Sequence, residues 1–225
     1  MSRISGEEMW GSGLMSSFNP VEAGGVEPTF AEMIETWIEM AWQDGSFGWI
    51  GIANLPSSFA AAAYLPDEGF ADVFTANDNH VTMGGQFFPN GQGVVVDGGY
   101  RVTGSWSFGS GTGHAEYVCA GFFPMENGEM RWAADGMPEM QVAVIPRDEI
   151  IFKDGWHVQG LKATGSYDWL WYADIVLAGR AGEDDRARFR QRGSQRDQHD
   201  AGDVGINSEG CGDAGVPSGD GIMHA

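Results

Sequence analysis

The stretch from Gly98 to Gly111, GGYRVTGSWSFGSG, combines aromatic rings with hydroxyl groups and glycines. Trp106 and Phe108 are two residues apart, so in a strand they would point to the same face. Ser110 and Gly111 follow at the end of that strand and would leave backbone N–H groups beside a flat apolar surface. Such a surface suits a planar, hydrogen-bonding cofactor such as a flavin. Packing of the two rings in the core is the simpler alternative.

Other common catalytic patterns are missing from the sequence. The five histidines do not have metal-ligand spacing, so no metal site is predicted; they are His80, His114, His157, His199 and His224. The chain contains neither the G-x-S-x-G of a serine hydrolase nor the G-x-x-x-x-G-K-[ST] of a phosphate-binding loop. Cys119 and Cys211 lie far apart and suggest neither a disulfide framework nor a zinc ribbon. An aromatic and hydroxyl site therefore remains the leading candidate.

The charge of the chain limits its partners. Its formal net charge is −20, which disfavours binding to nucleic acid and to anionic membrane surfaces. No apolar run reaches the ~20 residues of a membrane span, and the first residues do not resemble a signal peptide. We therefore expect a soluble, cytoplasmic protein that acts on a small molecule.

Helices are predicted over about residues 29–74. Thr29 and Glu32 have the spacing of a capping box, and apolar residues then recur every three to four positions until Asp44 and Gly45. A second helix follows, in which Pro56 is expected to cause a kink rather than an end. The segment from Pro66 resembles the start of a short third helix.

Strands are predicted over about residues 80–178, where β-branched and aromatic runs alternate with Gly, Pro, Asn and Asp. The segment VVVDGGYRV carries the strongest hairpin signal. Six or seven short strands without intervening helices predict an antiparallel sandwich or small barrel. The fold class is therefore α+β, with a helical domain at 1–79 and a β-barrel domain at 80–179. Residues 180–225 contain few large apolar side chains and are predicted to be a disordered tail.

Three motifs in this order resemble the acyl-CoA dehydrogenase superfamily of flavoproteins, and within it the reduced-flavin-dependent aromatic hydroxylases. These motifs are the helix PTFAEMIETWIEMAWQDGSFGW, the segment VDGGYRVTGSWSFGSGTGHAEYV and the segment DGWHVQGLKATGSYD. The resemblance runs from about residue 6 to about residue 168. It implies a helical domain, a β-barrel and a C-terminal four-helix bundle, with the bundle absent here. The composition change near residues 169–180 is interpreted as a truncation or a reading-frame shift, and Met1 as a start inside the native fold.

The resemblance also implies a set of site residues. Ser110 would lie near the reactive N5 of the flavin. The other cofactor-binding positions would be Phe88, Asn90, Trp106, Phe108, Gly111, Thr164 and Ser166. Trp49 would face the substrate pocket, and Ser57 stands where the hydroxylases often carry a histidine that activates a phenol.

The resemblance implies a flavin-dependent oxidoreductase that uses FAD or FMN. A reduced-flavin monooxygenase acting on a small ring substrate, supplied by a flavin reductase, is the main interpretation. The alternatives are an acyl-CoA dehydrogenase that oxidises an acyl thioester with FAD, and a non-catalytic β-barrel. The intact family implies a homotetramer. Because its first 179 residues hold few basic groups, the chain on its own is expected to bind flavin weakly and to be inactive.

Overall fold

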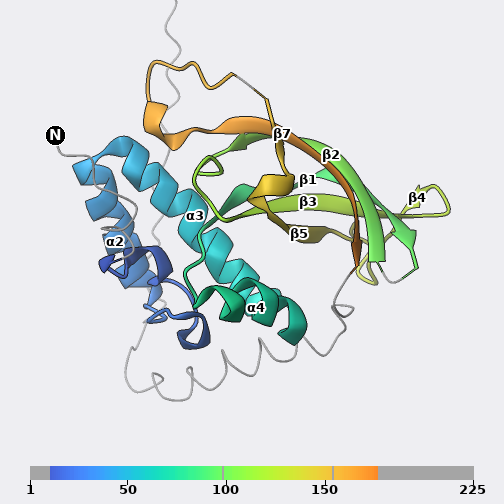
Figure 1. Cartoon of the computed structure of the whole chain (residues 1–225), viewed down its shortest axis with the longest axis horizontal. Coiled ribbons are helices and arrows are strands. Elements are labelled where there is room, and N and C mark those ends of the chain that lie inside the picture. Colours follow the sequence, from blue (N-terminus) through green and yellow to red (C-terminus); the bar gives the residue numbers. More distant parts are fainter. Residues whose placement is uncertain (1–10, 98, 154, 177–225) are drawn as a thin grey trace, which may run out of the picture. The chain divides into compact units, whose positions relative to one another are not determined.

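The computed structural model describes residues 11–97, 99–153 and 155–176, and it begins with a helical part. The α-helices are α2 (Phe30–Gln43), α3 (Gly45–Tyr64) and α4 (Asp67–Val73) (Figure 1). The predicted capping box is present, since the Thr29 hydroxyl accepts from the Glu32 N–H and the Glu32 carboxylate accepts from the Thr29 N–H. Asp44 ends α2 and caps α3 through the N–H groups of Ser46 and Phe47. The predicted helices are therefore confirmed, and α3 continues through Pro56.

The described strands form one sheet. Its strands are β1 (Met83–Val96), β2 (Gly99–Gly109), β3 (Tyr117–Glu126), β4 (Glu129–Met130), β5 (Gln141–Pro146), β6 (Ile151–Phe152) and β7 (Tyr167–Val176). The strand order is β4-β3-β1-β2-β7-β6, with β5 also paired to β3. Val96 pairs with Gly99, which confirms the predicted β1–β2 hairpin. The change from helices to strands falls between Asn77 and Met83.

Two features of the predicted barrel are wrong. The sheet is open rather than closed, because among the described strands β5 and β6 pair only with β3 and β7 and not with each other. It is also not wholly antiparallel, since β1 and β3 run parallel. After β2 the chain crosses to the far side of β1 in a short segment, residues 110–116, and β3 then runs in the same direction as β1. Glu116 and Tyr117 donate backbone hydrogen bonds to the Thr82 carbonyl, which fixes this crossing at the start of β1.

Alternating side chains give the sheet two different faces. Val118 belongs to a core cluster that contains Trp106 and Trp169, whereas its neighbour Cys119 belongs to a cluster with residues of α3 and α4. The helices thus cover one face of the sheet, and large aromatic side chains fill the other. A third cluster joins α2 to α3. None of the described helices is both long and apolar enough to cross a membrane.

Candidate functional site

Three hydroxyl groups and one indole N–H form a hydrogen-bonded chain where β2 ends and β7 begins. Trp49, from α3, donates its Nε1–H to the Ser110 Oγ at 2.8 Å. The Ser110 Oγ lies 2.7 Å from the Ser166 Oγ, which lies 2.7 Å from the Thr164 Oγ1. All three hydroxyl residues are buried, while Trp49 remains half exposed. The structure therefore brings together four of the residues that the sequence singled out.

The directions of these hydrogen bonds follow from the last acceptor of the hydroxyl chain, a backbone carbonyl. The Thr164 hydroxyl lies 2.9 Å from the Leu161 carbonyl oxygen, which can only accept, so Thr164 must donate there. Because each hydroxyl has a single proton, Ser166 must then donate to Thr164, and Ser110 to Ser166. The Ser110 oxygen accepts from Trp49 and keeps one further lone pair. Ser110 is thus set up to accept one more hydrogen bond and has no proton left to donate.

Gly111 holds the crossing segment against the turn that carries Thr164. Its N–H donates to the Thr164 carbonyl at 2.8 Å. Its φ is +75°, and an added Cβ would lie 2.3 Å from the Asn54 Oδ1. Any larger residue would therefore clash with a buried side chain in a backbone conformation that already disfavours it.

Asn54 is a residue of this site that the sequence analysis missed. Its side chain is buried in α3, and its Nδ2 donates to the carbonyl of Met83 and, at 3.5 Å, to that of Ser110. Its Oδ1 is buried without a partner among the described residues. A signal was present, because Asn54 interrupts the apolar face of a helix between Gly51 and Ser58, and a buried polar group is usually there to make hydrogen bonds.

Trp106 and Phe108 do not share a face, so that expectation is wrong. Trp106 is fully buried, stacks on Trp169 at 4.4 Å between ring centroids and donates its Nε1–H to the Gly121 carbonyl. Phe108 is 68% exposed. The pairing of β2 with β7 shifts register between Trp106 and Gly109, and Phe108 has a φ of +59°. A β-bulge at this point breaks the strict alternation of side chains and turns Phe108 outward.

The remaining predicted residues make no described contact with the hydroxyl chain. Phe88 and Asn90 lie in an irregular part of β1, where pairing with β3 shifts between Gln86 and Gly91, rather than in a loop. Phe88 is as exposed as Phe108, and the Asn90 Nδ2 donates to Gln86. Ser57 is buried, and its hydroxyl donates to the Ala53 carbonyl within α3. Whether these three residues contact a cofactor or a substrate stays a prediction.

Electrostatic effects near the site are local. The pKa of His114 is lowered from its ordinary 6.5, chiefly because neighbouring groups partly desolvate the charged ring, although the residue keeps an exposed surface; Glu116 opposes this shift and Arg147 adds to it. Burial raises the pKa of the Cys119 thiol to about 12. Both groups are therefore in their neutral forms near pH 7.

The sequence is similar to those of known hydroxylases and monooxygenases. No family model matches the chain. It is 33% identical over 158 residues to the oxygenase component of the FADH(2)-dependent resorcinol hydroxylase of Rhizobium sp. (strain MTP-10005), covering 69% of this chain and 36% of that protein. It is 32% identical over 168 residues to the indole-3-acetate monooxygenase of Pseudomonas putida, covering 73% and 40%. The chain therefore spans well under half the length of these curated relatives.

Solved structures agree with the sequence comparison. The HsaA monooxygenase from M. tuberculosis superposes with a TM-score of 0.67 at 28% identity, over 76% of this chain and 44% of that one. XiaF from Streptomyces sp., solved with FADH2 and glycerol, has a TM-score of 0.66 at 23% identity, over 78% and 43%, and this likeness is one of fold alone. The arrangement of helices and open sheet described above is thus shared with known flavin monooxygenases.

Proposed function

We propose that this chain, a homologue of the oxygenase components of flavin-dependent monooxygenases, takes part in the hydroxylation of a small ring substrate by reduced flavin and oxygen. The reported relatives are named hydroxylases or monooxygenases, which favours this chemistry over oxidation of an acyl thioester. The reaction consumes one O2 and two electrons from the flavin, placing one oxygen atom on the ring and releasing the other as water. A separate reductase would supply the reduced flavin.

The fixed direction of the hydroxyl chain is the observation that supports this proposal most. Reduced flavin carries a hydrogen on N5, whereas oxidised flavin has only a lone pair there. Ser110 has a lone pair free and its own proton committed to Ser166. Ser110 would therefore accept a hydrogen bond from the N5–H of the reduced flavin. Against the oxidised flavin, its lone pair would face the lone pair of N5, which is unfavourable.

The surface around Ser110 also fits a flavin ring. Phe108 is exposed at the bulge two residues before Ser110, and its backbone N–H is held by the Asp168 carboxylate at 3.2 Å. An exposed apolar ring next to a hydrogen-bond acceptor provides the features that a planar heterocycle needs. We assign Phe108, Ser110 and Gly111 to this contact, and Phe88 and Asn90 to the flavin edge.

Trp49 would link the cofactor to the substrate. Its indole N–H binds Ser110, and about half of its surface is exposed and could contact a substrate ring. Ser57 cannot remove a proton from a phenol, because a serine hydroxyl is a weak base and this one is already bonded to the Ala53 carbonyl. The family's tetramer stays a prediction.

The test is a comparison of flavin affinities under anaerobic conditions. We expect the chain to bind reduced FMN or FAD more tightly than the oxidised form. Ser110→Ala should weaken binding of the reduced flavin by about three- to tenfold, the value of one neutral hydrogen bond. Ser57→Ala is the matched control, because its hydroxyl is also buried but bonds only its own helix, and it should leave both affinities unchanged.

A second variant tests the direction of the chain. Thr164→Val removes the acceptor for the Ser166 proton, so Ser110 and Ser166 become free to reverse their hydrogen bond. The preference for reduced over oxidised flavin should then shrink, although Thr164 is two hydrogen bonds away from Ser110. Absence of binding to either redox form would contradict the proposed function, whereas binding unaffected by Ser110→Ala would contradict only the assigned contact.

A further inference from the structure

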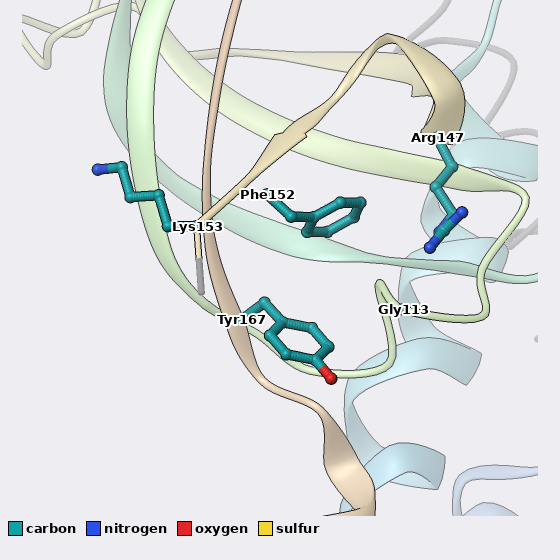
Figure 2. A pocket seen from close by; sticks show the side chains of 5 residues that line it. All are labelled: Gly113, Arg147, Phe152, Lys153 and Tyr167. Carbon is teal, nitrogen blue, oxygen red and sulfur yellow. The ribbon is translucent and has the colours of Figure 1, made fainter. Parts of the chain in front are cut away.

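A pocket of about 310 Å³ lies near the hydroxyl chain but is built from other side chains. It is lined by Gly113, Arg147, Phe152, Lys153 and Tyr167 (Figure 2). Ser166 immediately precedes Tyr167, the first residue of β7. Ser166 joins the hydroxyl chain and Tyr167 lines the pocket, so the two sites are built from different side chains of this segment.

Arg147 is held in a fixed position at the pocket. Its Nε donates to the Thr112 carbonyl at 2.9 Å, and its guanidinium carbon lies 5.2 Å from the centre of the Phe152 ring. Phe152 in turn meets the Tyr167 ring edge to face, with 6.1 Å between centroids. Figure 2 shows the Arg147 side chain extending from its ribbon toward the loop that carries Gly113. An arginine fixed in this way loses little conformational entropy when it binds a ligand.

The charge of Arg147 is not neutralised by the described part of the protein. Within it, Arg147 makes no ion pair, and its two terminal NH2 groups have no hydrogen-bond partner. The Glu116 carboxylate, which lies in the same loop region, is occupied by the N–H and hydroxyl of Thr82. A free guanidinium fork is notable in a chain whose net charge is −20.

Lys153 also lines the pocket but does not share this role. Its Nζ donates to the Ser105 Oγ at 2.9 Å, and in Figure 2 its side chain points away from Arg147 and the two rings. The pocket thus presents one planar cation beside two aromatic rings. The geometry of a guanidinium matches two oxygens of a carboxylate or a phosphate, which it binds through parallel hydrogen bonds.

We propose that this pocket binds the oxyanion group of a small ligand, a carboxylate or a phosphate, through the terminal NH2 groups of Arg147. The site is distinct from the surface around Ser110 and does not depend on the proposed function. The volume is at the lower end of the range for small-molecule sites, which fits a ligand the size of one substituted ring or one phosphate group.

The experiment is calorimetric titration of the full chain, at constant ionic strength, with benzoate and separately with inorganic phosphate. We expect at least one of the two to bind, and their relative affinity identifies the source of the oxyanion. Arg147→Met should weaken that binding about tenfold or more, and Arg147→Lys, which keeps the charge but loses the fork, should give an intermediate loss. Lys153→Met removes the other cation of the lining, whose side chain points away from Arg147 and the two rings, so it should weaken binding clearly less than Arg147→Met does.

Several results would overturn the proposal. Failure of both probes to bind the unaltered chain would do so without any variant, and so would an equal loss in Arg147→Met and Lys153→Met, which would indicate general attraction by charge. FMN provides the last arm. If Arg147→Met weakens FMN and phosphate binding equally, the pocket belongs to the flavin site and the claim of a separate site is wrong. Unchanged FMN affinity supports it.

Discussion

Replacement of Gly111 by alanine tests how the hydroxyl chain is held in place. At this position φ is +75°, which costs a residue with a Cβ about 1–2 kcal/mol. The added Cβ would also lie 2.3 Å, 2.5 Å and 2.7 Å from three side-chain atoms of Asn54. Asn54 must then move away, leaving the buried Met83 carbonyl without its donor at a cost of about 1–3 kcal/mol. Gly111→Ala should therefore lower the free energy of unfolding by about 2–5 kcal/mol.

Two controls separate the contributions. Gly136 has a similar φ of +79° with nothing within 4 Å of its added Cβ, so Gly136→Ala should cost only the conformational term of about 1–2 kcal/mol. Asn54→Ala removes the obstructing side chain, so in that background Gly111→Ala should also cost about 1–2 kcal/mol. Urea unfolding followed by tryptophan fluorescence measures all four variants. If Gly111→Ala costs no more than Gly136→Ala, the contact between Asn54 and the crossing segment is not what holds the site.

Three further predictions concern single side chains. Trp106→Ala should cost about 3–5 kcal/mol in urea unfolding because it empties a buried site, while Phe108→Ala at the exposed bulge should cost less than about 1 kcal/mol; similar losses would contradict the bulge. With Cys211 replaced by serine, the Cys119 thiol should react with a disulfide reagent at pH 8 only upon unfolding, because burial raises its pKa to about 12; rapid labelling of native protein would disprove this. Since the pKa of His114 is lower in the folded state than its ordinary 6.5, protons favour the unfolded state, and stability should fall as the pH drops below that value. His114→Gln should lose less stability than the parent chain between pH 7 and pH 5, and identical pH profiles would refute this.

The helices and the strand segments were predictable because their signals are local. The capping box at Thr29 and the Asp44 cap are read directly from neighbouring residues, and both are present. The closure of a barrel is different, since it depends on pairing between segments that are distant in sequence. Whether β5 meets β6 cannot be judged from the composition of either strand, and the prediction of a closed barrel failed there.

The proximity of some of the predicted site residues could also be anticipated, while their role in binding stays a prediction. The resemblance pointed to Trp49, Ser110 and Thr164, and the structure places their side chains in one hydrogen-bonded chain. The rule that strand side chains alternate between two faces failed for Phe108. A β-bulge adds a residue to one strand, and the alternation holds only where the pairing is regular. Asn54 belongs to no catalytic motif, because its amide does not react but binds the backbone carbonyls of Met83 and Ser110.

Two residues in unfavourable backbone conformations adjoin this chain of hydroxyl groups. Among the described non-glycine residues with positive φ, Phe108 and Leu161 are the ones with large apolar side chains, and each would relax by about 1–3 kcal/mol in an ordinary conformation. Phe108 exposes its ring two residues before Ser110, and Leu161 bears the carbonyl that receives the Thr164 proton. That carbonyl fixes the direction of every hydroxyl back to Ser110. The strain at Leu161 and the acceptor character of Ser110 are therefore linked, because the Leu161 carbonyl sets the direction of the hydrogen bonds that end at Ser110. The buried hydrogen bonds of this series offset the cost of the two unfavourable backbone conformations.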